Sequence, residues 1–178
     1  ATCDGYFFKD KPVVLVGGGN TAVTYALFMA GIASKVYVVH RRDEFRAENA
    51  LVERLKTSPK VQLVLNSVVE RIEGTGKVER VIVKDVNSGK QSVINADAIF
   101  ISVGEVPRSG LAQTLGIALD ERGYIKTNER QETSLPGVYA AGDVCGKGWP
   151  QAINAAAQGM TAGIECSRYV QQLKKTGK

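Results

Sequence analysis

The chain has 178 residues, of which 44% are hydrophobic, and it carries a formal net charge of +5 at pH 7. The apolar content excludes an intrinsically disordered chain, and the scattered basic residues do not form the stripe expected of a nucleic-acid-binding domain. Three widely spaced cysteines exclude a secreted disulfide framework and a zinc site, and no apolar run approaches the ~20 residues of a membrane helix. We therefore expect a cytosolic protein without a signal peptide or metal site, which associates with neither nucleic acid nor membrane.

A strand, a glycine-rich turn and a helix follow one another near the start of the chain. Residues 13–16 form a continuous apolar run, as a buried parallel strand does. The letters GGGNTA at 17–22 fit the pattern G-x-G-x-x-A, and an amphipathic helix is expected over 20–30, with Gly31 as its stop signal. A second apolar run at 36–39 completes a strand–helix–strand unit of the kind that binds dinucleotides.

Each position of this glycine-rich turn has a role if the unit binds a dinucleotide. Gly17 permits the sharp turn, and Gly19 lets the backbone approach a pyrophosphate. Ala22 is small enough for the helix and the strand to pack closely. Asn20 and Thr21 begin the helix, whose free N–H groups and partial positive charge attract phosphate. The alternative is a purely structural glycine turn in an α/β domain that binds no nucleotide.

The residues after the second strand indicate which dinucleotide binds. An NAD site places an acidic residue there to bind the ribose hydroxyls, but this sequence reads His40-Arg41-Arg42. A helix capped by Asp43 would put Arg42 and Arg46 on one face, where planar guanidinium groups suit a 2'-phosphate. We therefore predict NADPH rather than NADH, with His40 as a packing residue or a ribose contact. The alternative is a solvated basic turn.

The middle of the chain is predicted to add a helix and a β-meander. Apolar residues spaced over 45–55 indicate a helix that ends near Ser58-Pro59. The following segment reads as strands separated by turns at 74–76 and 87–89. Partial alternation at 81–84 favours a half-exposed meander rather than a strand covered on both faces.

A last strand of this region is expected over 98–103, as a buried apolar run that ends at Gly104. Gly104 is included among the candidate cofactor-binding residues. Two strand–helix repeats, a meander and a returning strand together predict an α/β protein, as a variation of the doubly wound nucleotide-binding fold.

The residues after Pro107 follow a different pattern. A short helical piece is expected at 111–115, short strands near 124–126 and 137–141, and a long helix after Trp149 with Pro150 in its first turn. A unit with two short strands is marginal on its own, so this segment needs a sheet from elsewhere. The long helix carries a face of small residues that permits a close approach or a helix–sheet contact: Ala155, Ala156, Gly159, Ala162 and Gly163.

Four motifs, in this order and spacing, carry a resemblance to a known family. They are ATCDG at the start, VGGGNTA, HRRDEFRA, and TSLPGVYAAGDV followed by PQA. The chain resembles the low-molecular-weight thioredoxin reductases, which are flavin-dependent pyridine-nucleotide disulfide oxidoreductases. The resemblance implies a Rossmann-like, three-layer FAD/NAD(P)-binding fold with a β-meander, in which an NADPH domain is inserted into an FAD domain. It implies an NADPH-binding domain over 1–107 and the C-terminal part of an FAD-binding domain over 108–178, within a longer polypeptide.

The resemblance also implies roles for particular residues. Cys3 matches the second cysteine of a Cys-x-x-Cys redox motif, and Asp4 matches the acid that handles protons at the dithiol. The NADPH contacts implied are Gly17, Gly19, Asn20, Thr21, Ala22, His40, Arg41, Arg42, Arg46 and Gly104. The FAD contacts implied are Gly142, Asp143, Gln151 and Ala152. This chain departs from the family at Pro150, where an arginine is typical, and at Thr24 and Tyr25, where acidic residues are common.

The activity implied is a relay of reducing equivalents. A hydride passes from NADPH to FAD, the reduced flavin reduces the Cys-x-x-Cys disulfide, and the dithiol reduces thioredoxin. A cytoplasmic homodimer is implied as well, with Cys145 and Cys166 as structural thiols. Two alternatives remain open: a peroxiredoxin-type or small-molecule disulfide as acceptor, and an NADPH-binding module without turnover.

Overall fold

A computed structural model describes residues 1–175, and they divide into two compact units. Unit 1 is Ala1–Gly104, and unit 2 begins at Glu105 and continues to the end of the chain.

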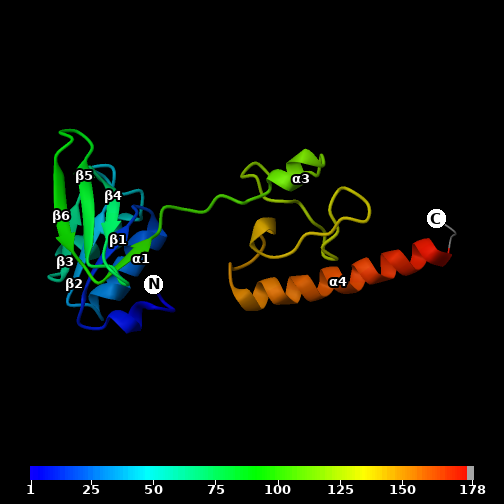
Figure 1. Ribbon diagram of the computed structural model, residues 1–178, viewed down its shortest axis with the longest axis horizontal. Helices are drawn as coiled ribbons and strands as arrows, with labels where there is room; N and C mark the ends of the chain where they lie inside the picture. The colour runs from blue at the N-terminus through cyan, green and yellow to red at the C-terminus, as the bar shows by residue number, and fades with distance from the viewer. Residues whose placement is uncertain (176–178) are drawn as a thin grey trace. The chain divides into compact units, whose positions relative to one another are not determined.

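A four-stranded parallel sheet forms the centre of unit 1 (Figure 1). Its strands, in the order β3-β2-β1-β7, are Val61–Val64, Lys35–Val39, Pro12–Val16 and Ala98–Ile101. The helices that connect them are α1 (Asn20–Ala30) and α2 (Asn49–Thr57). The strand–turn–helix–strand unit expected over 13–39 is therefore confirmed.

Alternate residues of β1 build two separate cores. Val13 and Leu15 lie fully buried in a cluster with the apolar side chains of α1 and α2. Val14 faces the opposite way, into a cluster with Val39 and with Val83 of the meander. Side chains of successive strand residues point to opposite faces, so a strand buried on both faces reads as a continuous apolar run. Unit 1 consequently has the three layers expected: helices, parallel sheet and meander.

The third layer is an antiparallel sheet of β4 (Ser67–Glu73), β5 (Arg80–Asp85) and β6 (Gln91–Asn95), which Figure 1 shows side by side. The glycine turns expected between these strands are present, with positive φ at Gly74, Gly76 and Gly89. The expected partial alternation fails at Ile82, which is only 6% exposed. Ile82 lies on the central strand, opposite Arg71 and Val93, and cross-strand neighbours of this size cover it.

The first residues of the chain pack onto unit 1. A short 3₁₀ helix, Gly5–Phe8, places Tyr6 edge-to-face on Phe28 of α1, with ring centroids 5.8 Å apart. Phe8 makes the same kind of contact with Phe100 of β7 at 5.9 Å. These contacts hold the segment that carries Cys3 against α1 and β7.

The helix expected to present Arg42 and Arg46 on one face is absent, and that prediction was wrong. Residues 40–48 are irregular, and α2 begins only at Asn49. A helix would require the Arg46 N–H to donate to the Arg42 carbonyl, but both groups are used elsewhere. The Arg46 N–H donates to the Gly18 carbonyl at 2.8 Å, and the Arg42 carbonyl accepts from the Asn66 N–H at 3.2 Å. Asp43 accordingly caps no helix, and Phe45 lies outside α2.

The strand expected over 98–103 is shorter and less buried than predicted. β7 ends at Ile101, and the side chains of Ile101 and Val103 are each 65% exposed. β7 is an edge strand with β1 as its one neighbour in the sheet, so part of its surface has nothing packed against it among the described residues.

Unit 2 has less regular structure than the sequence suggests. Its helices are α3 (Gly110–Thr114) and α4 (Ala152–Lys175), with a 3₁₀ turn at Asp143–Cys145. The two short strands expected near 124–126 and 137–141 are single β-bridges, Leu119 with Ile125 and Glu132 with Tyr139. A small apolar cluster around Ala112, Ile117 and Ile125 is the only buried core described within this unit.

The long helix α4 has no buried residue within its described length, Ala152–Lys175. It contacts loops rather than a sheet: the Tyr139 hydroxyl donates to the Glu165 carbonyl at 3.3 Å, and Ala155 lies beside Gly142. Pro150 was expected in the first turn of this helix, but α4 begins only at Ala152, so that prediction was wrong. Among the helices described, none combines the length and the apolar character that crossing a bilayer would need.

Candidate functional site

The glycine-rich turn lies at the carboxyl end of β1, where it leads directly into α1. Gly17 has φ +149, a conformation that side chains rarely adopt, and its N–H donates to the Val39 carbonyl at 3.0 Å. A Cβ atom at Gly17 would lie 2.3 Å from the Ser102 carbonyl oxygen and 2.7 Å from the Ala22 Cβ. Three strand ends therefore meet at this turn, and a glycine and a small residue are both required for it to close.

The other two glycines of the turn meet different surroundings. A Cβ at Gly18 would lie 2.1 Å from the nearest atom of the His40 ring, whereas a Cβ at Gly19 would meet no atom within 4 Å. Gly19 is also the N-cap of α1, and no side chain caps this helix or places an acid in its first turn. The first N–H groups of a helix have no intrahelical partner, so Asn20, Thr21 and Ala22 present donors beside open space.

His40 follows β2 and packs against this turn. Its ring is 6% exposed, stacks on Phe45 with centroids 5.2 Å apart, and bonds through Nε2 to the Glu44 carbonyl at 3.0 Å. Since a carbonyl only accepts, Nε2 carries the proton. Burial lowers the pKa of His40 below its ordinary 6.5; the bond to Glu44 opposes this, and nearby guanidinium groups lower the pKa further. The imidazole is therefore a neutral packing element of the turn.

The guanidinium groups concerned belong to Arg41, Arg42 and Arg46. All three residues are exposed, and no ion pair within residues 1–175 involves any of them. Each acts on His40, so three positive charges gather beside the glycine-rich turn even though no helix aligns them. The end of β2 carries no acidic side chain that would bind ribose hydroxyls.

Glu48 belongs to this site, and the sequence analysis missed it. Its N–H donates to Asn20 Oδ1 at 2.8 Å, and its Oε1 accepts from Asn20 Nδ2 at 2.9 Å. An acid 28 positions from its partner leaves no local pattern to recognise. The capping-box pattern, in which a side chain bonds to an N–H at a helix start, is the nearest signal, but here the two residues belong to different helices.

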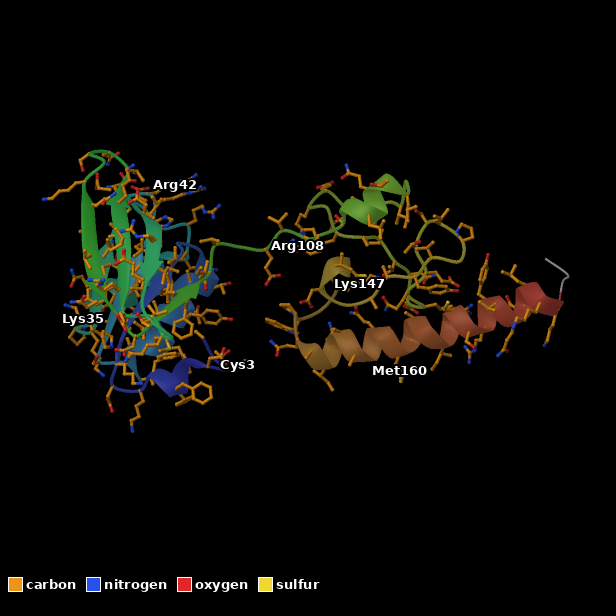
Figure 2. All side chains as sticks on the ribbon, in the orientation of Figure 1. Cys3, Lys35, Arg42, Arg108, Lys147 and Met160 are labelled. Carbon is orange, nitrogen blue, oxygen red and sulfur yellow. The ribbon has the colours of Figure 1, made fainter. Side chains whose placement is uncertain are left out.

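Cys3 and Asp4 lie elsewhere on unit 1. Cys3 is an exposed free thiol in a turn closed by the Gly5 N–H, which donates to the Ala1 carbonyl at 2.7 Å. Figure 2 shows Cys3 well separated from Arg42. Lys35 is the first residue of β2, whereas Arg42 follows the other end of that strand by three residues. The structure thus brings together the candidate pyrophosphate and 2'-phosphate residues and leaves the candidate redox residues apart from them.

The candidate FAD residues lie in unit 2. Asp143 is exposed and lines a cavity of about 370 Å³ together with Tyr124 and residues 105–108. Gly142 precedes it with φ +84, and the Gly142 N–H donates to the side chain of Gln158 at 2.7 Å. Gln158 was also missed by the sequence analysis, because one polar residue on a mostly exposed helix carries no signal.

The remaining predicted residues are accessible. Gln151 and Ala152 are exposed at the start of α4, where the Gln151 N–H donates to the Trp149 carbonyl at 2.8 Å. Gly104, with φ +102, is the last residue of unit 1. Cys145 is buried, and burial raises the pKa of its thiol.

The chain is similar to curated thioredoxin reductases. The one from Rickettsia felis is 43% identical over 174 residues, which is 96% of this chain and 56% of that protein. The one from Bacillus subtilis is 41% identical over 177 residues, 99% of this chain and 56% of that protein. The chain therefore spans about half the length of the curated relatives that it matches.

Solved structures agree with the sequence relatives. The crystal structure of thioredoxin reductase from Streptococcus pyogenes matches 95% of this chain and 55% of its own, with a TM-score of 0.79 and 38% identity. Thioredoxin reductase from Giardia duodenalis matches with a TM-score of 0.74 and 37% identity, over 96% of this chain and 56% of its own. The resemblance and the Rossmann-like fold class inferred from the motifs are confirmed. Residues 1–159 match the family model described as pyridine nucleotide-disulphide oxidoreductase, and the chain belongs to this family.

Proposed function

We propose that unit 1 binds NADPH, with the pyrophosphate at the glycine-rich turn and the 2'-phosphate at the arginines. The observation that carries this proposal is the gathering of three unpaired arginines beside a turn that offers free N–H groups. Guanidinium groups bind phosphate oxygens through paired N–H donors, and a helix N-terminus favours an anion. The open space at Gly19 is where a pyrophosphate would approach the backbone.

We further propose that residues 105–178 contribute to an FAD site, and that 1–107 and 108–178 correspond to the NADPH domain and to part of the FAD domain. The chemistry of the donors supports this: Asp143 offers carboxylate oxygens to hydroxyl groups, beside a cavity and a glycine turn that Gln158 holds in place. The side chains of Gln151 and Ala152 are exposed at the start of α4. When bound, the two cofactors would supply the hydride chemistry, while this chain would position them.

The activity that we propose for the longer protein is NADPH-dependent disulfide reduction with thioredoxin as the acceptor. Cys3 would be one thiol of a Cys-x-x-Cys dithiol in the longer protein. One thiolate of the dithiol would attack the acceptor disulfide, and the other would resolve the mixed disulfide, so that the acceptor leaves as a dithiol and the motif becomes a disulfide. The exposure of Cys3 supports this role, because exchange requires access to the sulfur. Asp4, directly after it, would accept or return the proton. A cytoplasmic homodimer is part of the proposal; the exposed apolar side chains of α4, including Ile153 and Met160, support further protein contacts.

Titration calorimetry of the 178-residue chain with NADP⁺ and NAD⁺ tests the first part of this proposal. One charge-assisted hydrogen bond contributes roughly 1.5–3 kcal/mol, so the arginines should favour NADP⁺ by at least about tenfold. Arg42→Ala should remove most of that preference. Lys35→Ala, which deletes a cation at the opposite end of β2, should leave it unchanged. Equal affinities of the native chain for the two dinucleotides would refute the proposal.

A further inference from the structure

The segment that carries the three arginines has no regular structure of its own. Residues 40–48 belong to no helix or strand, although they separate β2 from α2. Apart from the bond between His40 Nε2 and the Glu44 carbonyl, this described segment has no hydrogen bond between its own residues. Many conformations would be available to such a segment, and the guanidinium groups would spread over as many positions. Contacts with the rest of unit 1 must therefore set where these charges lie.

Several contacts fix part of this segment. The Arg42 carbonyl accepts from the Asn66 N–H at 3.2 Å, and Ala47 is buried in the core cluster that includes residues of α1 and α2. The Arg46 N–H donates to the Gly18 carbonyl at 2.8 Å, which joins the segment directly to the glycine-rich turn. The His40 ring packs against Gly18 and bonds to the Glu44 carbonyl. None of these contacts involves Glu48, the residue at which the segment enters α2.

The pair of Asn20 and Glu48 closes that end. Asn20 is the first residue of α1, and Glu48 is the N-cap residue of α2. The Glu48 side chain makes no capping hydrogen bond to the N–H groups of α2. The Asn20 amide uses both of its ends on Glu48, accepting from the backbone N–H at 2.8 Å and donating to the carboxylate at 2.9 Å. Two hydrogen bonds between the same residues restrict rotation as well as distance, so the start of α2 is held at a set position relative to the start of α1.

We propose that Asn20 and Glu48 are positioning residues, which hold the arginine segment beside the glycine-rich turn and so contribute to the preference for a 2'-phosphate. This inference rests on the proposed NADPH site. Glu48 follows Arg46 by two residues in the chain, so the pair would act on the arginines through the backbone. It would set the separation between the anion-binding turn and the guanidinium groups. A ligand that carries both phosphates gains from that set separation, whereas a ligand with one phosphate does not.

Substitutions at Glu48 distinguish positioning from simple electrostatics. Glu48→Ala removes the side-chain bond, whereas Glu48→Gln retains an oxygen that accepts from Asn20 Nδ2. Both variants delete a negative charge near three arginines, and charge alone would tighten the binding of an anion in each. Positioning predicts instead that Glu48→Ala weakens the binding of adenosine 2',5'-bisphosphate about fivefold, and that Glu48→Gln stays within about twofold of native.

The experiment is calorimetry of the full chain with adenosine 2',5'-bisphosphate and with 5'-AMP, combined with hydrogen exchange of the free protein. Glu48→Ala should also speed exchange of the amides in residues 41–48, while Glu48→Gln and the native chain exchange alike. Glu53→Gln is the matched control, because Glu53 lies on the exposed surface of α2 and pairs with Lys56. The control should change neither measurement.

The possible results separate the two levels of the argument. Tighter binding of the bisphosphate by both Glu48 variants, or unchanged hydrogen exchange in Glu48→Ala, overturns the positioning role. If the native chain still prefers the bisphosphate to 5'-AMP, the NADPH site is upheld in that case. A native chain that binds both nucleotides equally overturns the NADPH site and this inference with it. Weaker binding of adenosine 2',5'-bisphosphate by Glu48→Ala, with near-native binding by Glu48→Gln, supports both the NADPH site and the positioning role.

Discussion

Replacing Gly18 with alanine tests how the glycine-rich turn and His40 fit together. The added Cβ would lie 2.1–2.5 Å from three atoms of the imidazole, well inside contact distance. The ring cannot move freely, because it is buried, stacked on Phe45 and bonded to the Glu44 carbonyl. Gly18 itself does not require a positive φ, so the obstacle to alanine is the ring and not the backbone.

The expected cost follows from these contacts. Forcing a methyl group into a filled space costs about 1–3 kcal/mol, and displacing the ring forfeits a hydrogen bond of about 1 kcal/mol. Alanine also restricts the unfolded chain more than glycine does, and this stabilises the folded state by about 0.4–1 kcal/mol. We therefore expect Gly18→Ala to destabilise unit 1 by about 2 kcal/mol, and to be close to neutral once His40→Ala has removed the ring.

Hydrogen exchange by mass spectrometry on the full chain measures this change. Peptides covering β1 and α1 should exchange about thirtyfold faster in Gly18→Ala, which is the ratio that corresponds to ~2 kcal/mol. Gly19→Ala is the matched control, since its Cβ meets open space. Alanine is a poorer N-cap than glycine, so a small increase in exchange is expected, well below that of Gly18→Ala. Fluorescence of Trp149, the single tryptophan, follows unit 2 as an internal reference.

The double variant decides whether the explanation is correct. If Gly18→Ala costs as much in the His40→Ala background as in the native chain, the ring is not the obstacle. The close fit between Gly18 and His40 would then have no energetic consequence, and the account of this turn would be wrong.

Three further outcomes are expected. Gly17→Ala should destabilise unit 1 by about 3 kcal/mol or more in urea denaturation, which is more than Gly18→Ala. The reason is that a Cβ at Gly17 meets the backbone of Ser102 and that Gly17 has a positive φ. A loss of stability equal to or smaller than that of Gly18→Ala would contradict this. Unit 1 should lose stability as the pH falls below 6.5, because unfolded His40 takes up a proton that the buried ring with its lowered pKa resists; thermal unfolding of His40→Gln should not show this loss. In native-state alkylation followed by peptide mapping, Cys3 should react far faster than Cys145, whose burial and raised pKa both oppose formation of the thiolate, and comparable rates would contradict the buried position of Cys145.

Local patterns were sufficient for the first βαβ unit. A continuous apolar run, a glycine triplet and the stop signal at Gly31 predicted α1 over the residues that it occupies. The segment 42–46 failed for a physical reason: the spacing of Arg42 and Arg46 suits a helix, but their backbone groups bond to the Gly18 carbonyl and to Asn66. Propensity is a weak preference, and contacts from distant parts of the chain override it.

The sequence alone determined the layered α/β fold of unit 1, the glycine-rich turn, the basic residues after β2 and the family, because each is signalled by short patterns that can be recognised one segment at a time. Tertiary structure alone decided that His40 excludes any side chain at Gly18, that Asn20 holds Glu48, and that unit 2 has bridges where strands were expected. Those features depend on which distant segments meet, and hydrogen bonds between residues 28 positions apart leave no periodic trace in the sequence.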